Sequence, residues 1–197
     1  MAAKISRAQG GREGLARAAG VGDSKKDSEL SNKSQYLDIA KLHPQTLQAL
    51  KAAGWTTDRM MDVELPLETL KEAGFSFNAH AESVISTLYG LRVHPVDTES
   101  GEFINDDPLI LKPELCRRHR SAAELIQKEL GGNYVPLGWW LSSSYVFMED
   151  SGRVVGYLGG LVWRLGESVE DALNLMVRAD RPLVCGYVRP GRTPWPR

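Results

Sequence analysis

The chain has 197 residues, of which 42% are hydrophobic and 25% charged, and its formal net charge is −1. These values suit one globular domain with a tail, and no apolar run reaches the roughly 18 residues that a membrane helix needs. The basic N-terminus has no apolar stretch behind it, which argues against a secretory signal, and Cys116 and Cys185 fit no metal or disulfide pattern. A reduced, cytoplasmic protein is therefore expected.

Charge is distributed unevenly along the chain. Residues 1–35 carry seven basic and four acidic residues (+3), residues 36–180 carry 13 basic and 21 acidic residues (−8), and residues 181–197 carry four arginines and no acid (+4). The first segment, rich in glycine and poor in large apolar residues, is expected to be a disordered basic tail. Residues 36–180 are predicted to fold, and residues 181–197 to form a Pro/Arg-rich tail that is extended or docked, with Trp195 as its apolar anchor.

Three short helices are expected at the start of the folded body. The first covers residues 44–53, with a proline in its first turn and Gly54 after its end, so that Trp55 can fold back onto it. The second covers residues 65–73 and ends at Gly74. Asn78 caps the third, whose apolar positions form one stripe: Ala81, Val84, Ile85 and Leu88. A first strand then begins at residues 91–93.

An acidic loop follows over residues 94–108, with a short extended piece at Phe103-Ile104. Its acids are Asp97, Glu99, Glu102, Asp106 and Asp107. Adjacent carboxylates can bind a hard cation, but their spacing matches no calcium loop, so solvated loop acids are the favoured interpretation and no metal site is predicted.

Residues 113–130 are predicted to form the longest helix. One stripe on it would contain Leu115, Ala122, Ile126 and Leu130. Cys116 and His119 have the spacing of half a zinc site, but no second ligand pair exists, which favours an accidental match. The arginines at 117, 118 and 120 are expected to pair with carboxylates.

The C-terminal half of the body has the pattern of an antiparallel sheet closed by a helix. Residues 135–138 lead into the sheet, and the β-branched and aromatic runs at 145–147 and 154–157 are joined by the turn sequence Asp150-Ser151-Gly152. Another strand is expected at 161–163, and Ser168 caps the closing helix. Because Trp139 and Trp140 are adjacent in a strand, they should point to opposite faces, and one of them is expected to be exposed.

The sequence contains no group of residues with the spacing of a known catalytic motif. The four histidines are scattered, and the sequence contains no nucleophile elbow, P-loop or dinucleotide fingerprint. We therefore predict no catalytic residue, no cofactor and no metal. A small hydrolase or nucleotide-binding enzyme that uses residues such as His119 and the acids near Asp106 is the least favoured of the alternatives.

Several short motifs, in this order and spacing, resemble the SUKH superfamily of bacterial immunity proteins, and within it the third subclass. The motifs span residues 47–176: Ala53-Gly54-Trp55, Asp58-Arg59, Leu88 to Leu91, Phe103-Ile104, Asp106-Asp107-Pro108, Val135-Pro136-Leu137-Gly138, Gly152-Arg153-Val154, and Leu165-Gly166 with Ser168, Ala172 and Leu173. One departure is Tyr89, which stands where such proteins have the first of two glycines. If that position needs a positive φ, tyrosine would be strained there, so the turn should differ or the alignment should shift by one.

The resemblance implies an α+β fold, with N-terminal helices packed on a largely antiparallel sheet and a closing C-terminal helix. It also implies a non-enzymatic protein that binds a cognate toxin domain, often a nuclease, without touching nucleic acid or membrane. An intracellular regulatory or scaffold protein, like the eukaryotic members of the superfamily, is the alternative, and genomic context would separate the two. The oligomeric state is left open.

A basic nuclease cleft would attract the acidic body, and burying that cleft would exclude its substrate. Candidate contact residues are the loop acids, the hairpin tip and one tryptophan: Asp97, Glu99, Glu102, Asp106, Asp107, Trp139, Glu149 and Asp150. For Trp139, as for Trp140, ordinary core packing is the competing interpretation.

Overall fold

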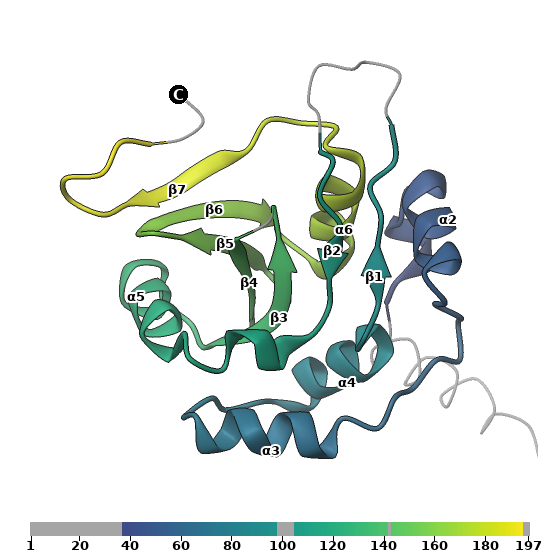
Figure 1. The fold of residues 1–197 in the computed structure, drawn as a ribbon, viewed down its shortest axis with the longest axis horizontal. Helices are drawn as coiled ribbons and strands as arrows, with labels where there is room; N and C mark the ends of the chain where they lie inside the picture. Colours follow the sequence, from purple (N-terminus) through teal and green to yellow (C-terminus); the bar gives the residue numbers. More distant parts are fainter. Residues whose placement is uncertain (1–36, 98–104, 142, 195–197) are drawn as a thin grey trace, which may run out of the picture.

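The computed structural model describes residues 37–97, 105–141 and 143–194, and these form an α+β fold (Figure 1). The helices are η1 (Ile39–Lys41), α2 (Pro44–Ala52), α3 (Glu64–Glu72), α4 (Ala79–Leu88), η2 (Pro113–Cys116), α5 (Arg120–Leu130) and α6 (Val169–Arg178). The strands are β1 (Arg92–Val93), β2 (Leu109–Ile110), β3 (Tyr134–Trp140), β4 (Ser144–Glu149), β5 (Val154–Leu158), β6 (Leu161–Gly166) and β7 (Val184–Val188).

The described strands form one sheet in which spatial order follows chain order. Strands β1 to β7 are neighbours in sequence, and each neighbouring pair is antiparallel. The predicted hairpin is β4–β5, and Gly152 takes the positive φ of +99° in its turn, a conformation that glycine adopts without steric cost.

Helices cover both faces of this sheet. The apolar side of α6, including Leu173 and Met176, is buried with Trp163 on one face. On the other face, α5 places Ile126 against the cluster that contains Phe147. Helix α2 packs on α6 and beside β1 (Figure 1). The predicted α+β architecture is confirmed.

The expected caps of the N-terminal helices are present. The side chain of Asn78 accepts a hydrogen bond from the Ala81 N–H at 2.7 Å. Gly54 has a φ of +96°, which turns the chain so that the Trp55 N–H reaches the Leu50 carbonyl at 2.9 Å and the indole is buried. Both caps confirm what the residue pattern predicted.

The long helix expected over residues 113–130 is wrong as a single element. The chain makes the short turn η2, breaks, and starts α5 at Arg120, because His119 has φ −112° and ψ 30°, outside helical geometry. The break sends the Cys116 side chain into the core and leaves Leu115, predicted to lie on the apolar stripe, 41% exposed.

Tyr89 is not strained. Its φ is −52°, and Gly90 takes the positive φ of +78° in its place. The Tyr89 hydroxyl donates to Glu114 Oε1 at 3.0 Å, and burial is the main cause that raises the pKa of this phenol. The turn after α4 therefore accommodates tyrosine through local geometry.

Some expectations fall on residues that the structure does not describe. These are the tail at 1–35, the extended piece at Phe103-Ile104, the acids Glu99 and Glu102, and Trp195. Beyond residue 180 the described chain forms β7, which pairs with β6, so this segment is extended and docked. The boundary at 180 stays a prediction. Among the described residues, no helix has the length and apolarity needed to cross a bilayer.

Candidate functional site

The described ends of the acidic loop are fixed to the C-terminal end of α6. The Val96 N–H donates to the Val177 carbonyl at 2.9 Å, and Asn105 Nδ2 donates to the Met176 carbonyl at 2.7 Å. These bonds satisfy carbonyls that the last turn of a helix leaves without an intrahelical partner. Asp97 and Asp106 are exposed beside these anchors. Asp97 and Asp106 therefore lie beside a backbone that is hydrogen-bonded to α6.

The two tryptophans of β3 divide as the strand alternation predicts. Trp140 is 3% exposed, and its Nε1 donates to the Met176 carbonyl at 3.1 Å on the α6 face. Trp139 is partly exposed and borders, with Asp107 and Arg92, a cavity of about 190 Å³. The structure thus brings two predicted site residues, Trp139 and Asp107, together.

The hairpin tip lies at the other end of the sheet. Tyr134 pairs with Glu149 at one end of the β3–β4 ladder, whereas Trp139 pairs with Tyr145 near the other, roughly 17 Å away at 3.3 Å per residue. The tip acids also hold local structure: Asp150 Oδ1 accepts from Asn133 Nδ2 at 3.0 Å, and Glu149 Oε2 accepts from the Ser151 N–H at 3.0 Å. Those of the predicted contact residues that the structure describes therefore form two separate groups rather than one site.

A surface that the sequence analysis missed lies on α3 and the segment before it. Met60, Met61 and Leu65 are 52%, 43% and 73% exposed, although neighbouring Leu67 and Leu70 are buried. The sequence did contain a signal for this surface. Met60 and Met61 are adjacent, are followed by acidic residues, and belong to the apolar stripe of no predicted helix.

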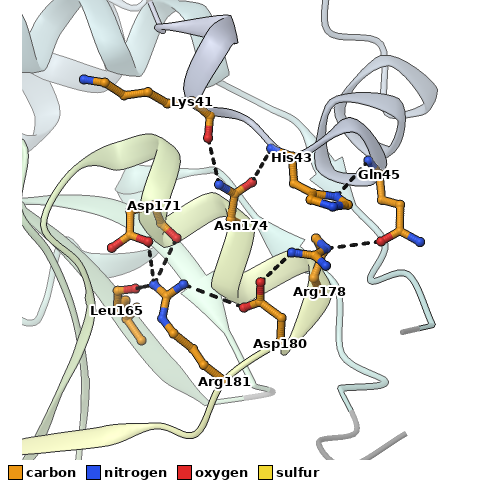
Figure 2. A network of polar contacts seen from close by, with 9 residues as sticks. All are labelled: Lys41, His43, Gln45, Leu165, Asp171, Asn174, Arg178, Asp180 and Arg181. Atoms are coloured by element: carbon orange, nitrogen blue, oxygen red, sulfur yellow. Dashed lines mark hydrogen bonds and ion pairs between the residues drawn. The ribbon is translucent and has the colours of Figure 1, made fainter. Parts of the chain in front are cut away.

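The polar network drawn in Figure 2 joins the start of the described chain to α6 and to the segment leading into β7. Asn174 accepts from the His43 N–H at 2.8 Å and donates to the Lys41 carbonyl at 2.9 Å. Arg181 forms an ion pair with Asp171 at 2.8 Å and donates to the Leu165 carbonyl at 3.0 Å. Because these contacts run to backbone groups or opposite charges, the cluster is a structural tie and not a reactive centre.

We expect Asn174→Ala to lower the free energy of unfolding by about 1–2 kcal/mol, because two backbone groups lose their partner. Asn174→Asp is the matched control: it can still accept from the His43 N–H but cannot donate to the Lys41 carbonyl, so its loss should be intermediate. Urea unfolding of both variants measures this, and equal stability of Asn174→Ala and the wild type would contradict the role of the tie.

Cys116 and His119, which have the spacing of half a zinc site, make unrelated contacts. The Cys116 thiol is fully buried and donates to the Gly138 carbonyl at 3.3 Å, and burial raises its pKa, which disfavours the nucleophilic thiolate. The His119 ring stacks on Tyr145 with centroids 3.7 Å apart. Within the described ranges, no group of three or more His, Cys, Asp or Glu side chains is placed to hold a metal ion.

The arginines beside this pair differ in their contacts. Arg120 pairs with Glu124 at 3.4 Å, as expected, and its guanidinium also lies 5.3 Å from the ring centroid of Phe75. Arg117 and Arg118 are exposed. The arrangement around η2 and α5 therefore stabilises the helix on the sheet rather than forming a phosphate site.

Comparison with protein families gives one match: the model described as SUKH-3 immunity protein fits residues 42–179. Comparisons with curated proteins and with solved structures gave no match. The matched range contains all the described helices from α2 to α6 and the strands β1 to β6, which is most of the chain. The chain belongs to the SUKH-3 immunity protein family, whose members bind and neutralise a toxin and are not enzymes.

Proposed function

We propose that this protein neutralises a nuclease toxin domain by binding over its active site and excluding nucleic acid. The observation that carries the proposal is the charge of the folded body, −8 over residues 36–180. A nuclease holds phosphates with a basic cleft, so its surface attracts an acidic body and its substrate competes for the same charges. The immunity protein needs no catalytic group for this task.

Electrostatic attraction acts mainly on the rate of association. Exposed Asp97 and Asp106, together with Asp107, are candidates for this steering, as are Glu99, Glu102 and the tip acids Glu149 and Asp150. Trp139 supplies a partly exposed aromatic ring beside Asp107. Tryptophan is among the residue types that contribute most binding energy in protein interfaces. The complex would form in the cytoplasm of the producing cell, where the toxin's substrate lies.

The direct experiment is co-expression with the cognate toxin domain. We expect rescue of growth, a co-purifying complex, and loss of nuclease activity in the purified mixture. Rescue without loss of nucleic-acid cleavage in vitro would rule out occlusion as the mechanism.

Neutralising the loop with Asp97→Asn, Glu99→Gln, Glu102→Gln and Asp106→Asn should slow association about 10-fold at low ionic strength, because four charges leave the steering field. Association rates measured at two salt concentrations test this, since screening should shrink the difference between the variant and the wild type.

The matched control neutralises Asp38, Glu124, Glu129 and Glu167, which are exposed acids outside the loop, the hairpin tip and the groove between α3 and α4. If this control variant slows association as much as the loop variant does, steering comes from the whole body rather than from the loop. An unchanged rate in both variants would remove electrostatics from the proposal.

A further inference from the structure

Among the described residues of the N-terminal half, the most exposed apolar side chains lie at or beside the groove between α3 and α4. The groove has a volume of about 570 Å³, and its lining includes Met60, Met61, Leu67 and Ser86. Leu65 is 73% exposed on the first turn of α3 and follows directly after Glu64, which lines the groove. Because α3 buries Leu67 and Leu70 to pack on the domain, folding does not require Met60, Met61 or Leu65 at these positions.

These side chains are presented from a fixed backbone. Arg59 donates to the carbonyls of Thr87 and Tyr89, at 3.2 and 2.8 Å, and so caps the C-terminal end of α4. The Met61 N–H donates to the Ser86 carbonyl at 3.0 Å. The segment 59–61 is therefore held against α4 from both sides of Met60, and a partner that binds there does not have to order it first.

Charge around the groove has one dominant sign. Residues 58–82 contain six acids and two cations, a net −4, which is half of the −8 of the whole body. Asp62, Glu64 and Glu68 are exposed along the rim, and Lys71 bridges the groove to Glu82 at 3.2 Å. An apolar centre with an acidic rim is complementary to an apolar stripe flanked by lysine or arginine.

We propose that this groove anchors the toxin domain by accepting a basic amphipathic helix of that domain. The inference rests on the proposed function and assigns the anchoring contacts to Met60, Met61 and Leu65. Methionine adapts its shape to a partner's side chains, and a groove between two helices is a common receptor for a third.

The location of the groove separates the roles of the predicted contact residues. It lies at the end of the molecule opposite to the described ends of the acidic loop, which rise at the top of Figure 1. The hairpin tip is close to the same end as the groove, because Asn78 Nδ2, at the start of α4, donates to the Asp150 carbonyl at 3.3 Å. Loop acids then act by steering, while the groove holds the partner.

A second copy of this chain is a poor occupant of the groove. A two-fold symmetric contact would set the acidic rim of one copy against the identical rim of the other, and like charges placed face to face oppose binding. A basic partner is attracted to the acidic rim, so it meets no such repulsion.

The test compares a combined variant, Met60→Ala, Met61→Ala and Leu65→Ala, with the wild type in binding to a catalytically inactivated form of the cognate toxin domain. We expect Kd to rise about 30-fold, mostly through faster dissociation, since anchors removed from an interface act on the lifetime of the complex. Thermal unfolding should change little, because the three side chains are exposed and the one hydrogen bond printed for them, from Thr87 Oγ1 to Met60 Sδ at 3.8 Å, has a weak sulfur acceptor.

The matched control replaces three other exposed apolar side chains, Leu115, Leu158 and Val184, by alanine, and its Kd should stay within about 2-fold of the wild type. If the wild type binds the toxin and the groove variant binds equally well, the groove assignment is overturned while the proposed function stands. If the wild type does not bind, both fail. A groove variant that changes only self-association measured by sedimentation would identify a second copy as the occupant and overturn the proposal.

Discussion

Replacing Gly138 or Gly166 by alanine is expected to abolish stable folding, with a loss of at least about 3 kcal/mol for each. A Cβ added at Gly138 would fall on the Ile110 carbonyl oxygen, and would lie 3.0 Å from the Lys112 nitrogen. A Cβ added at Gly166 would overlap the Ala172 nitrogen and lie 2.8 Å from the Ser168 carbonyl oxygen. Backbone atoms cannot move aside as a flexible side chain can, so the strand pairing or the start of α6 would have to shift.

Gly159→Ala is the control for this prediction. Its φ is +59°, but nothing lies within 4 Å of an added Cβ, so it should lose only about 1 kcal/mol from backbone strain. Chemical denaturation and circular dichroism of the three variants measure the difference. A cooperative transition for Gly138→Ala at the wild-type midpoint would show that β2 and β3 can separate without loss of stability.

These two glycines also show which part of the family resemblance could be understood from sequence and which could not. Gly138 and Gly166 belong to short motifs that the sequence analysis could quote but not interpret, since the reason for glycine is a tertiary contact. The hairpin turn at 150–152 was predictable because its cause is local: residues that favour a tight turn between two strand-forming runs. Motif position was therefore readable from sequence, whereas its physical reason required the structure.

The elements that sequence analysis missed or merged depend on distant contacts. The helix predicted over 113–130 has continuous apolar periodicity, but the chain breaks at His119, whose ring stacks on Tyr145 of β4. Strand β7 follows a proline and contains a glycine, a weak strand pattern, and it exists by pairing with β6. The local sequence pattern carries no information about the contact with Tyr145 or the pairing with β6. The helix break and strand β7 could therefore not be predicted from local sequence.

The candidate site was predictable in composition but not in arrangement. Acidic residues and a tryptophan were identified from charge and strand alternation, yet sequence order could not tell that Trp139 and Asp107 share a cavity while Glu149 lies at the far end of the strands. The exposed Met60–Met61 pair was overlooked because methionine is usually a core residue. Its exposure becomes informative only once the packing of α3 and α4 is known.

Trp140→Ala should lower the free energy of unfolding by about 4 kcal/mol, whereas Trp139→Ala should lose less than about 2 kcal/mol. The two residues are adjacent in β3, but only Trp140 is 3% exposed, packed in the same cluster as Met148 and Trp163 under α6. Its Nε1 also donates to the Met176 carbonyl, which Asn105 shares at the base of the acidic loop. Removing this ring opens a cavity and loosens that base.

Trp140→Phe separates the two contributions. It keeps most of the packing and removes the hydrogen bond to Met176, so about 1–2 kcal/mol should be lost, with the remainder of the Trp140→Ala effect assigned to the cavity. Toxin affinity measured well below the unfolding temperature completes the comparison: Trp139→Ala should weaken binding if its partly exposed ring contacts the toxin, while Trp140→Phe should leave affinity unchanged. Equal stability losses for the two alanine variants would contradict the assignment of opposite faces, because a partly exposed ring and a ring buried against α6 do not bury the same apolar area.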